Sequence, residues 1–341
     1  MKTKHLLSLV AACSFTFLVS GGLMAAKWRV NNMPQMYANF TNLQTAINTV
    51  AAGDTLLVEG SATSYGSLTI SKSIVIFGPG YFLNENDSTQ VNKQSVNLTH
   101  IIIQPTSSGT IIKGLNIISG GIDCISVQAS NIIIQNCYMR SPSSNGADCI
   151  YISNSASGIQ IIGCYIKAEF GGIGKYCIWN YNGSNISIFN NYIEGTSHQN
   201  VLIDSQNNSV VMNNILNYGQ FVLSNTTFRN NILIYPNVFT LSGVITNNIS
   251  NTGGIGNQNG NIESVDMNNV FVCYSNCSSY TLDERYRLKV GSVAIGAGYG
   301  GVDCGIFDGP YPYTISGLPN IPAIWEITNF GSSFLIKAKS H

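Results

Sequence analysis

The stretch NIIIQNCYM, which begins at Asn131, is the first of six copies of one short phrase, and this repeat decides the fold. The later copies are GIQIIGCYI from Gly158, NISIFNNYI from Asn185, NSVVMNNIL from Asn208, NTTFRNNIL from Asn225 and SGVITNNIS from Ser242. Their starts lie 27, 27, 23, 17 and 17 residues apart, which is about one turn of a parallel β-solenoid per copy. The sequence therefore predicts an all-β solenoid of stacked coils.

Each position of the phrase has its own predicted role. The fourth is always apolar and is expected to face the core, because side chains alternate along a strand; its occupants are Ile134, Ile161, Ile188, Val211, Phe228 and Ile245. The sixth and seventh positions, usually Asn-Asn, mark a bend, because Asn tolerates left-handed backbone. Stacking is expected to align these amides as a ladder.

A second strand precedes each of the first four copies, at 123–127, 148–152, 176–180 and 200–204. The two final coils, of 17 residues each, are expected to lose a strand or a loop.

Charged residues are unusually scarce. They make up 9% of the 341 residues, against 44% hydrophobic residues, and the formal net charge is zero. A soluble domain usually has about 25% charged residues, so the low content fits a solenoid whose surface is covered by stacked polar side chains. Nucleic-acid binding needs a basic face, and the neutral charge balance argues against it.

The N-terminus has the pattern of an export signal. Lys2 and Lys4 precede an apolar run that ends in small residues, which predicts a signal peptide over residues 1–26. An alternative is lipoprotein cleavage before Cys13, which would anchor the protein. Later segments fall short of the ~18 uninterrupted apolar residues of a membrane span. The prediction is therefore a secreted or extracytoplasmic protein without a transmembrane span in the mature chain.

The mature chain, 27–341, is predicted to be one monomeric domain. Residues 41–52 have apolar side chains at helical spacing behind Thr41, which predicts an N-terminal capping helix. Coils are expected from about residue 55 to about residue 305. The Pro-rich segment 306–341 is expected to wrap the C-terminal end, because proline suits edges better than central strands.

Most of the nine cysteines recur once per coil. Residues at equivalent places in adjacent coils lie about 4.8 Å apart with parallel side chains, a poor geometry for a disulfide. Two columns are therefore predicted to hold buried thiols: Cys124, Cys149 and Cys177 in one, and Cys137 and Cys164 in the other. A soft-metal site along the first column is an alternative. Cys273 and Cys277 are the best candidates for a disulfide.

These residues resemble the right-handed parallel β-helix superfamily with the pectin lyase-like fold. The stretch AINTVAAGDTLLVEG is similar to the entry of that fold, and SVAIGAGYGGVDCGIF and SGLPNIPAI are similar to the close of secreted proteins of Bacteroidetes-type bacteria. The resemblance implies the fold for nearly the whole mature chain. Polygalacturonases of this fold carry an Asp-Asp-Cys signature, but here Asp123 and Asp148 are preceded by Ile122 and Ala147. The Gly-His-Gly and pectate-lyase Trp-Asp-His signatures are also absent, so neither catalytic set transfers intact.

Charged residues of the central coils fall near the loops that follow each phrase, on one side of the solenoid. The eighth and tenth positions place Tyr138 beside Arg140, Tyr165 beside Lys167 and Tyr192 beside Glu194. Stacked rings with adjacent cations suit an acidic sugar, whose carboxylate an Arg or Lys would meet. The candidate catalytic residues are Lys167, Arg140 and Asp148, and the candidate substrate-binding residues are Tyr138, Tyr165, Tyr192, Glu169, Lys175, Glu194 and His198.

In a lyase, one cation would offset the charge of the sugar carboxylate, and Lys167 or Lys175, if its pKa were lowered, would abstract the proton alpha to it. Asp148 and Glu169 would supply oxygen ligands if Ca²⁺ were used, and apart from the soft-metal alternative at the first cysteine column no other cofactor or metal site is predicted. The favoured function is a carbohydrate-engaging protein with a polysaccharide or cell-surface glycan as partner. The alternative is a polysaccharide lyase or glycoside hydrolase. A purely structural interpretation also stays open, in which the tyrosines stack on their neighbours and the charges are simply solvated.

Overall fold

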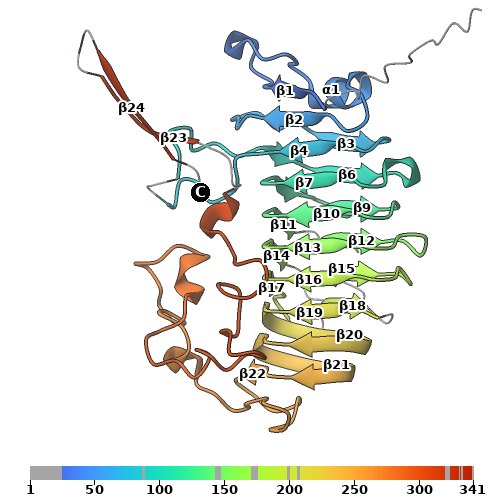
Figure 1. The fold of residues 1–341 in the computed structure, drawn as a ribbon, viewed down its shortest axis with the longest axis vertical. Coiled ribbons are helices and arrows are strands. Elements are labelled where there is room, and N and C mark those ends of the chain that lie inside the picture. Colours follow the sequence, from blue (N-terminus) through green and yellow to red (C-terminus); the bar gives the residue numbers. More distant parts are fainter. Residues whose placement is uncertain are drawn as a thin grey trace, which may run out of the picture.

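The computed structural model describes residues 25–86, 89–142, 147–169, 176–197, 200–205, 208–318, 323–329, 331 and 333–339. Within these ranges 22 strands form the stacked coils of a right-handed parallel β-helix, as predicted, and two more form a separate hairpin. Figure 1 shows the coils stacked along one long axis, with the C-terminal part of the chain packed beside them. The signal-peptide prediction falls almost wholly outside the described residues.

The coils build three parallel sheets. Sheet 1 contains β1(Lys27–Val30), β2(Thr55–Val58), β4(Val75–Phe77), β7(Ile111–Lys113), β10(Ile133–Gln135), β13(Gln160–Ile162), β16(Ser187–Phe189) and β19(Val210–Met212). Sheet 2 contains β3(Ser67–Ile70), β6(His100–Ile103), β9(Ile125–Val127), β12(Ile150–Ile152), β15(Tyr176–Asn180) and β18(Val201–Ser205). Sheet 3 contains β5(Asn97–Leu98), β8(Asn116–Ile118), β11(Tyr138–Ser141), β14(Tyr165–Ala168), β17(Tyr192–Glu194) and β22(Ile249–Ser250).

The last two full coils are single long strands. β20(Ile215–Arg229) and β21(Ile232–Thr246) each run through all three sheets and pair with each other in parallel. The shortening to 17 residues therefore removes the loops between the strands, and no strand is lost. These coils lie at the lower end of the solenoid in Figure 1.

The repeated phrase spans two strands, so each central coil has three strands where the sequence indicated two. The bend lies at the sixth position, which has a positive φ in every copy: 52° at Asn136, 60° at Gly163, 56° at Asn190, 56° at Asn213, 58° at Asn230 and 56° at Asn247. Gly and Asn are the residues that adopt this conformation at least cost. The predicted role of the sixth position in the bend is confirmed.

The seventh position builds the predicted amide ladder. The Asn214 side-chain oxygen accepts the backbone N–H of Asn191 at 2.9 Å, and its amide nitrogen donates to the Asn231 side-chain oxygen at 3.0 Å. The same exchange continues through Asn248 to Asn261. These side chains are buried, and each amide satisfies backbone groups that the bend leaves unpaired. The asparagine column thus holds the turn between sheets 1 and 3.

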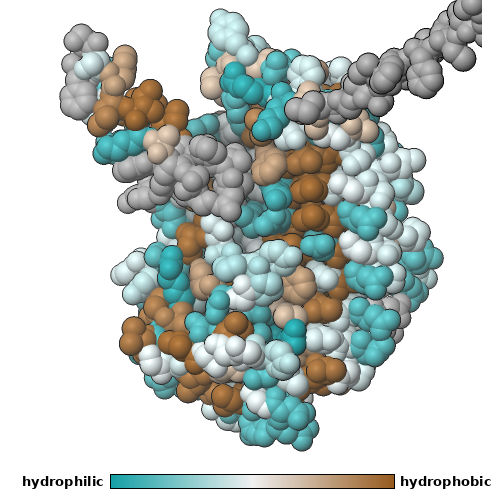
Figure 2. All heavy atoms as spheres, viewed as in Figure 1, coloured by the Kyte–Doolittle hydropathy of each residue, from teal (hydrophilic) through white to brown (hydrophobic). Residues whose placement is uncertain are grey.

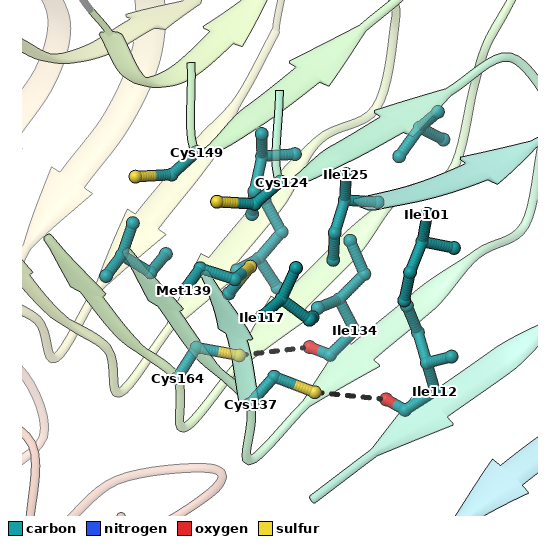
Figure 3. Packing of buried hydrophobic residues seen from close by; sticks show 14 of the residues in the cluster. Ile101, Ile112, Ile117, Cys124, Ile125, Ile134, Cys137, Met139, Cys149 and Cys164 are labelled. Carbon is teal, nitrogen blue, oxygen red and sulfur yellow. Dashed lines mark hydrogen bonds between the residues drawn. The ribbon is translucent and has the colours of Figure 1, made fainter. Parts of the chain in front are cut away.

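The core lies inside the coils. Five of the six fourth-position residues are fully buried, and Ile245 packs partly buried against them near the end of the solenoid. The two cysteine columns face the same interior as free buried thiols, as predicted. Figure 3 shows Cys137 and Cys164 pointing to the carbonyl oxygens of Ile112 and Ile134, at 3.9 and 3.6 Å. Cys273 and Cys277 form the predicted disulfide.

The N-terminal end of the core is closed by α1(Leu43–Thr49) after β1 has paired with β2. Its buried face contributes Leu43, Ala46 and Ile47 to the core. The helix cap is Asn42 rather than Thr41, because the Asn42 side chain accepts the N–H of Thr45 at 2.8 Å. No helix in the described part of the chain has the length and hydropathy of a membrane span.

The C-terminal end differs from the expected boundary. The parallel strands stop at β22, with one further bridge from Ile249 to Ile262, so the coils end well before residue 305. Residues 263–318 contain three short 3-10 helices, at Met267–Asn269, Glu284–Tyr286 and Ile315–Gly317. This covering segment packs on the outer face of sheet 3 through a second apolar cluster, which includes Phe271, Tyr286 and Ile306.

The chain continues into the antiparallel hairpin of β23(Ala323–Asn329) and β24(Phe334–Lys339), which projects from the solenoid in Figure 1. Figure 2 shows apolar side chains on this hairpin and an apolar stripe along the solenoid. The stripe lies over sheet 1, whose half-buried outward residues include Val75, Ile111 and Ile133. It runs parallel to the solenoid axis because equivalent positions stack from coil to coil.

Candidate functional site

The predicted charged residues do come together, at the end of sheet 3. Arg140, Lys167 and Glu194 occupy equivalent positions of β11, β14 and β17 and stack in register. Glu169, just beyond β14, lies 2.5 Å from the Arg140 guanidinium and 3.7 Å from the Lys167 ammonium, which is also 3.7 Å from Glu194. We call these four residues the charged row.

The charged row is an alternating set of ion pairs. The Glu169 carboxylate raises the pKa of Arg140. Burial raises the pKa of Glu169, but Arg140 and Lys167 together lower it more, so it lies below its usual range. Both cations have protein carboxylates as partners, so a sugar carboxylate would have to displace Glu169 or Glu194 to reach them. This arrangement suits a structural ladder better than an open acidic-sugar subsite.

Asp148 is engaged with the backbone. Its side chain is 3% exposed, and one carboxylate oxygen accepts the N–H of Tyr176 at 3.1 Å. One coil earlier, Asp123 accepts the N–H of Asp148 at the same distance. The two aspartates therefore bond to backbone amides at the entry to sheet 2. These hydrogen bonds support the coil junction, and at 3% exposure Asp148 offers little surface to a substrate.

The predicted tyrosine row exists, but it is covered. Tyr138, Tyr165 and Tyr192 stack in register, with 5.6 and 4.5 Å between successive ring centroids. Phe82 packs against Tyr138 and Tyr165 at 5.0 and 5.1 Å, and Tyr286 stacks on Tyr192 at 4.5 Å. Tyr165 and Tyr192 are only 2% and 0% exposed, so the expectation that they stack on a sugar is wrong. Tyr138 is half-buried.

The tyrosines point out of the coil, as the alternation predicted, but the covering segment and the Phe82 loop then bury them. Burial raises the pKa of Tyr165 and Tyr192 well above the ordinary value. The Tyr192 hydroxyl is part of a polar network, because it lies 2.6 Å from the Tyr286 hydroxyl and donates to Glu194 at 3.1 Å. The charged row therefore borders a buried aromatic cluster.

Two predicted residues, Lys175 and His198, lie outside the described residues, and their roles stay predictions. Within the described ranges, no three His, Cys, Asp or Glu side chains converge as a metal site would require. The Cys124 and Cys149 thiols hydrogen-bond to the backbone carbonyls of Arg140 and Lys167, and burial raises the pKa of both thiols.

An aromatic surface that the sequence reasoning missed lies on the outer face of sheet 2. Tyr151 of β12 and Trp179 of β15 are in register on adjacent coils, with ring centroids 5.2 Å apart. Tyr176 lies 5.1 Å from Trp179, with an angle of 14° between the rings, and Tyr181 packs edge-on at 5.7 Å. Tyr181 is 47% exposed and the other three are half-buried. We call these four residues the aromatic platform.

Aspartates flank the platform. The outward column of sheet 2 runs Ser126, Tyr151, Trp179, Asp204, and Asp123 accepts the Ser126 hydroxyl at 2.9 Å. Burial is the main cause that raises the pKa of Tyr151 and of Tyr176. Tyr181, Asp123 and Asp148 raise the pKa of Tyr151 further. Asp204 and Asp148 do the same for Tyr176. Asp148 and Asp204 are themselves buried, with 3% and 9% of their surface exposed.

A sequence signal for the platform existed. Aligned by their cysteines, the segments DCISV, DCIYI and YCIWN have Ser126, Tyr151 and Trp179 at the same fourth place. Two consecutive large aromatics at an outward position of a strand stand out against the many Asn, Ser and Thr residues of the chain, just as the tyrosine row does.

Comparisons with known proteins assign neither a family nor an activity to this chain. No protein-family model matches the sequence, and no curated protein matches it. Among solved structures, pectate lyase Pel9A is similar over 85% of this chain and 98% of its own, with a TM-score of 0.47 and 14% identity. A pectin methylesterase solved with a hexasaccharide is similar over 65% of this chain and 70% of its own, with a TM-score of 0.32 and 9% identity. At these values neither similarity assigns an activity.

Proposed function

We propose that the protein binds carbohydrate through the aromatic platform, without cleaving it. One observation carries this proposal: four contiguous aromatic rings with solvent-facing surface stand on adjacent coils, between aspartates. Tyr and Trp combine a large apolar face with a polar edge, which matches a sugar ring with its apolar C–H face and peripheral hydroxyls. Carboxylates accept hydrogen bonds from hydroxyls.

The platform is also rigid, which favours binding. Tyr151 and Trp179 stand on central strands whose inward neighbours, Ile150 and Ile178, are fully buried in the core. A ligand that meets such a surface does not have to order it, so less free energy is lost on binding. The stacked coils hold the rings at the spacing of the strands.

The charged row supports binding over catalysis. In the described structure, Arg140 and Lys167 have carboxylate partners and Asp148 is buried. The alternative of a polysaccharide lyase or hydrolase, with catalytic Lys167, Arg140 and Asp148 and with Lys175 and His198 at the substrate, therefore has weaker support. The proposed partner is a polysaccharide or a cell-surface glycan, met by a secreted or surface-attached monomer.

Affinity electrophoresis through gels that contain soluble polysaccharides tests the proposal. Wild type should be retarded by at least one polysaccharide, and Trp179→Ala should weaken that binding about tenfold, as expected for loss of a central aromatic contact. Tyr37→Ala is the matched control, because Tyr37 is 88% exposed and lies between β1 and α1, which are several coils away from β12 and β15 in Figure 1. Equal retardation of wild type and Trp179→Ala would refute the site.

Two further assays complete the test. Reducing-end assays and ultraviolet absorbance of unsaturated products on the same polysaccharides should show no cleavage; product formation that is lost in Lys167→Ala would establish the enzymatic alternative. N-terminal sequencing of the exported protein should find a start near Lys27. Urea unfolding of each variant confirms that it is folded.

A further inference from the structure

We infer that a cavity between sheet 1 and the covering segment is a second ligand site, which takes a small carboxylate carried on a ring. The cavity has a volume of about 270 Å³. One wall is formed at the ends of β7 and β10, and the other by residues between 310 and 318 of the covering segment. Figure 1 shows the last part of this segment beside the ends of the same strands. The site goes beyond the proposed function, because it shares no residue with the aromatic platform on sheet 2.

Lys113 gives the cavity a single positive charge. It is in register with Phe77 of β4, and its ammonium lies 5.5 Å from the centre of the Phe77 ring. No carboxylate among the described residues pairs with this ammonium, and Asp87 is the only acidic residue outside the described ranges. Burial lowers the pKa of Lys113, and only the Cys137 thiol acts in the opposite direction. A half-buried cation of this kind is stabilised by one monoanion, which also forms a charge-assisted hydrogen bond with it.

Two uncharged polar groups of the cavity also lack a partner in the described structure. They are the side-chain amide of Gln135, in register with Lys113 on the next coil, and the hydroxyl of Thr314 on the covering segment. An amide and a hydroxyl each donate and accept hydrogen bonds. In the same cavity as the ammonium, they suit the second oxygen of a carboxylate or a hydroxyl of the same ligand. A few polar groups set in apolar surface are typical of a small-molecule site.

The apolar surface comes from the covering segment, whose residues 310–312 have the sequence Pro-Tyr-Pro. The Tyr311 ring stacks on Phe189 of β16, with 5.7 Å between the ring centroids. The Leu318 carbonyl oxygen accepts the side-chain amide of Asn136 at 3.3 Å. The wall is therefore fixed at both ends before a ligand arrives, which lowers the free-energy cost of binding. A volume near the lower end for ligand pockets suits one ring against these side chains, with its carboxylate at the ammonium.

Ligand-observed NMR titration with the full chain tests the inference. The probes are two acids, each with an uncharged counterpart: cyclohexanecarboxylate with cyclohexanecarboxamide, and galacturonate with its methyl ester. The first acid represents a free organic acid and the second the acidic residue of a glycan, so the acid that binds identifies the source. At least one acid should bind about tenfold more tightly than its counterpart, as expected when a charge-assisted hydrogen bond replaces a neutral one.

Two variants connect this binding to the cavity. Lys113→Met keeps an unbranched side chain of similar length and removes the charge, so it should weaken binding of the acid about tenfold and leave that of the uncharged counterpart nearly unchanged. Thr314→Val removes one hydroxyl and should weaken binding of the acid about threefold. Lys289→Met is the charge control, because Lys289 is an exposed lysine of the same covering segment. Urea unfolding confirms that each variant is folded.

Each outcome decides the site. Acid binding that is equal in wild type and Lys113→Met would overturn it, and so would uncharged counterparts that bind as tightly as the acids. If neither acid binds, the inference also fails. Asp87→Asn should leave the affinity unchanged, because the ammonium has no carboxylate to exchange; a large gain in affinity would show that Asp87 already neutralises Lys113 and would exclude the site. The test of the platform depends on Trp179 and is decided separately.

Discussion

Removal of one side chain from the asparagine ladder should destabilise the whole solenoid. Asn214→Ala deletes an amide that makes five side-chain hydrogen bonds: it accepts from the backbone and the side chain of Asn191, and donates to Ile188, Met212 and Asn231. In this variant the Asn191 side chain still donates its hydrogen bond to the Ile161 carbonyl oxygen, and the Asn231 side-chain oxygen still accepts the backbone N–H of residue 214. The Asn191 backbone N–H loses its side-chain acceptor.

The size of the effect follows from these losses. An orphaned buried donor costs about 1–3 kcal/mol, and each of the other lost bonds contributes about 0.5–1 kcal/mol net. Partial relaxation of the bend lowers the sum, so we expect the free energy of unfolding to fall by about 3–5 kcal/mol. This would be exceptional for one polar-to-alanine change in a protein of ordinary stability.

Equilibrium urea unfolding followed by circular dichroism measures this change. The matched control is Asn154→Ala, an exposed loop asparagine whose loss should change the free energy of unfolding by no more than about 0.5 kcal/mol. A value for Asn214→Ala within about 1 kcal/mol of wild type would show that the ladder adds little to stability. It would also leave Asn at the seventh position without a physical reason.

Three further outcomes are expected. Tyr192→Ala should lower the free energy of unfolding by about 3–5 kcal/mol, because it opens a cavity beneath Tyr286. Tyr151→Ala should cost less than half as much, because Tyr151 is only half-buried. Equal losses in urea unfolding would contradict the assignment of buried and open aromatic faces. The folded pKa of Glu169 is depressed, so its ion pairs stabilise the protein above the unfolded value of about 4.3, and this stabilisation is lost as the pH falls. Unfolding curves of wild type and Glu169→Gln should therefore differ at neutral pH, by less than about 1 kcal/mol for half-exposed pairs, and converge at acid pH; a constant gap would exclude this linkage. Thiol titration of the unfolded, unreduced mature chain should leave Cys273 and Cys277 unreacted and detect Cys124, Cys137, Cys149, Cys164, Cys177 and Cys304; reaction of all eight would show that the disulfide does not form.

The repeat was predictable because its constraints are local and periodic. The sixth position must be Asn or Gly because the backbone has a positive φ there. The fourth position must be apolar because its side chain faces the core. Each copy repeats the same requirement, so six copies identify both columns without a structure. The same logic found the in-register charged row and the free thiols. The third strand per coil was missed because the bend divides the phrase into two strands, and residue alternation alone does not show that break.

Burial of the tyrosine row was not predictable in this way. The alternation correctly placed Tyr165 and Tyr192 outside the coil, but their cover comes from Phe82 and Tyr286, which belong to non-repeating segments far away in sequence. A period of residues specifies the direction of a side chain and contains no information about which distant segment docks on it. The ends of the coils were misjudged for the same reason, since the covering segment 263–318 has no repeat of its own.

The covered row and the open platform are two outcomes of one construction. Each coil presents an outward column on each of its three faces, and aromatic residues stack there because equivalent positions coincide from coil to coil. On sheet 3 the covering segment turns that stack into a second core, and the charged row forms its polar border. On sheet 2 the described chain places no such segment over Tyr151 and Trp179, and Tyr181 at the edge remains nearly half exposed. The described fold leaves the rings on sheet 2 uncovered, so these rings are the ones that remain accessible to a ligand.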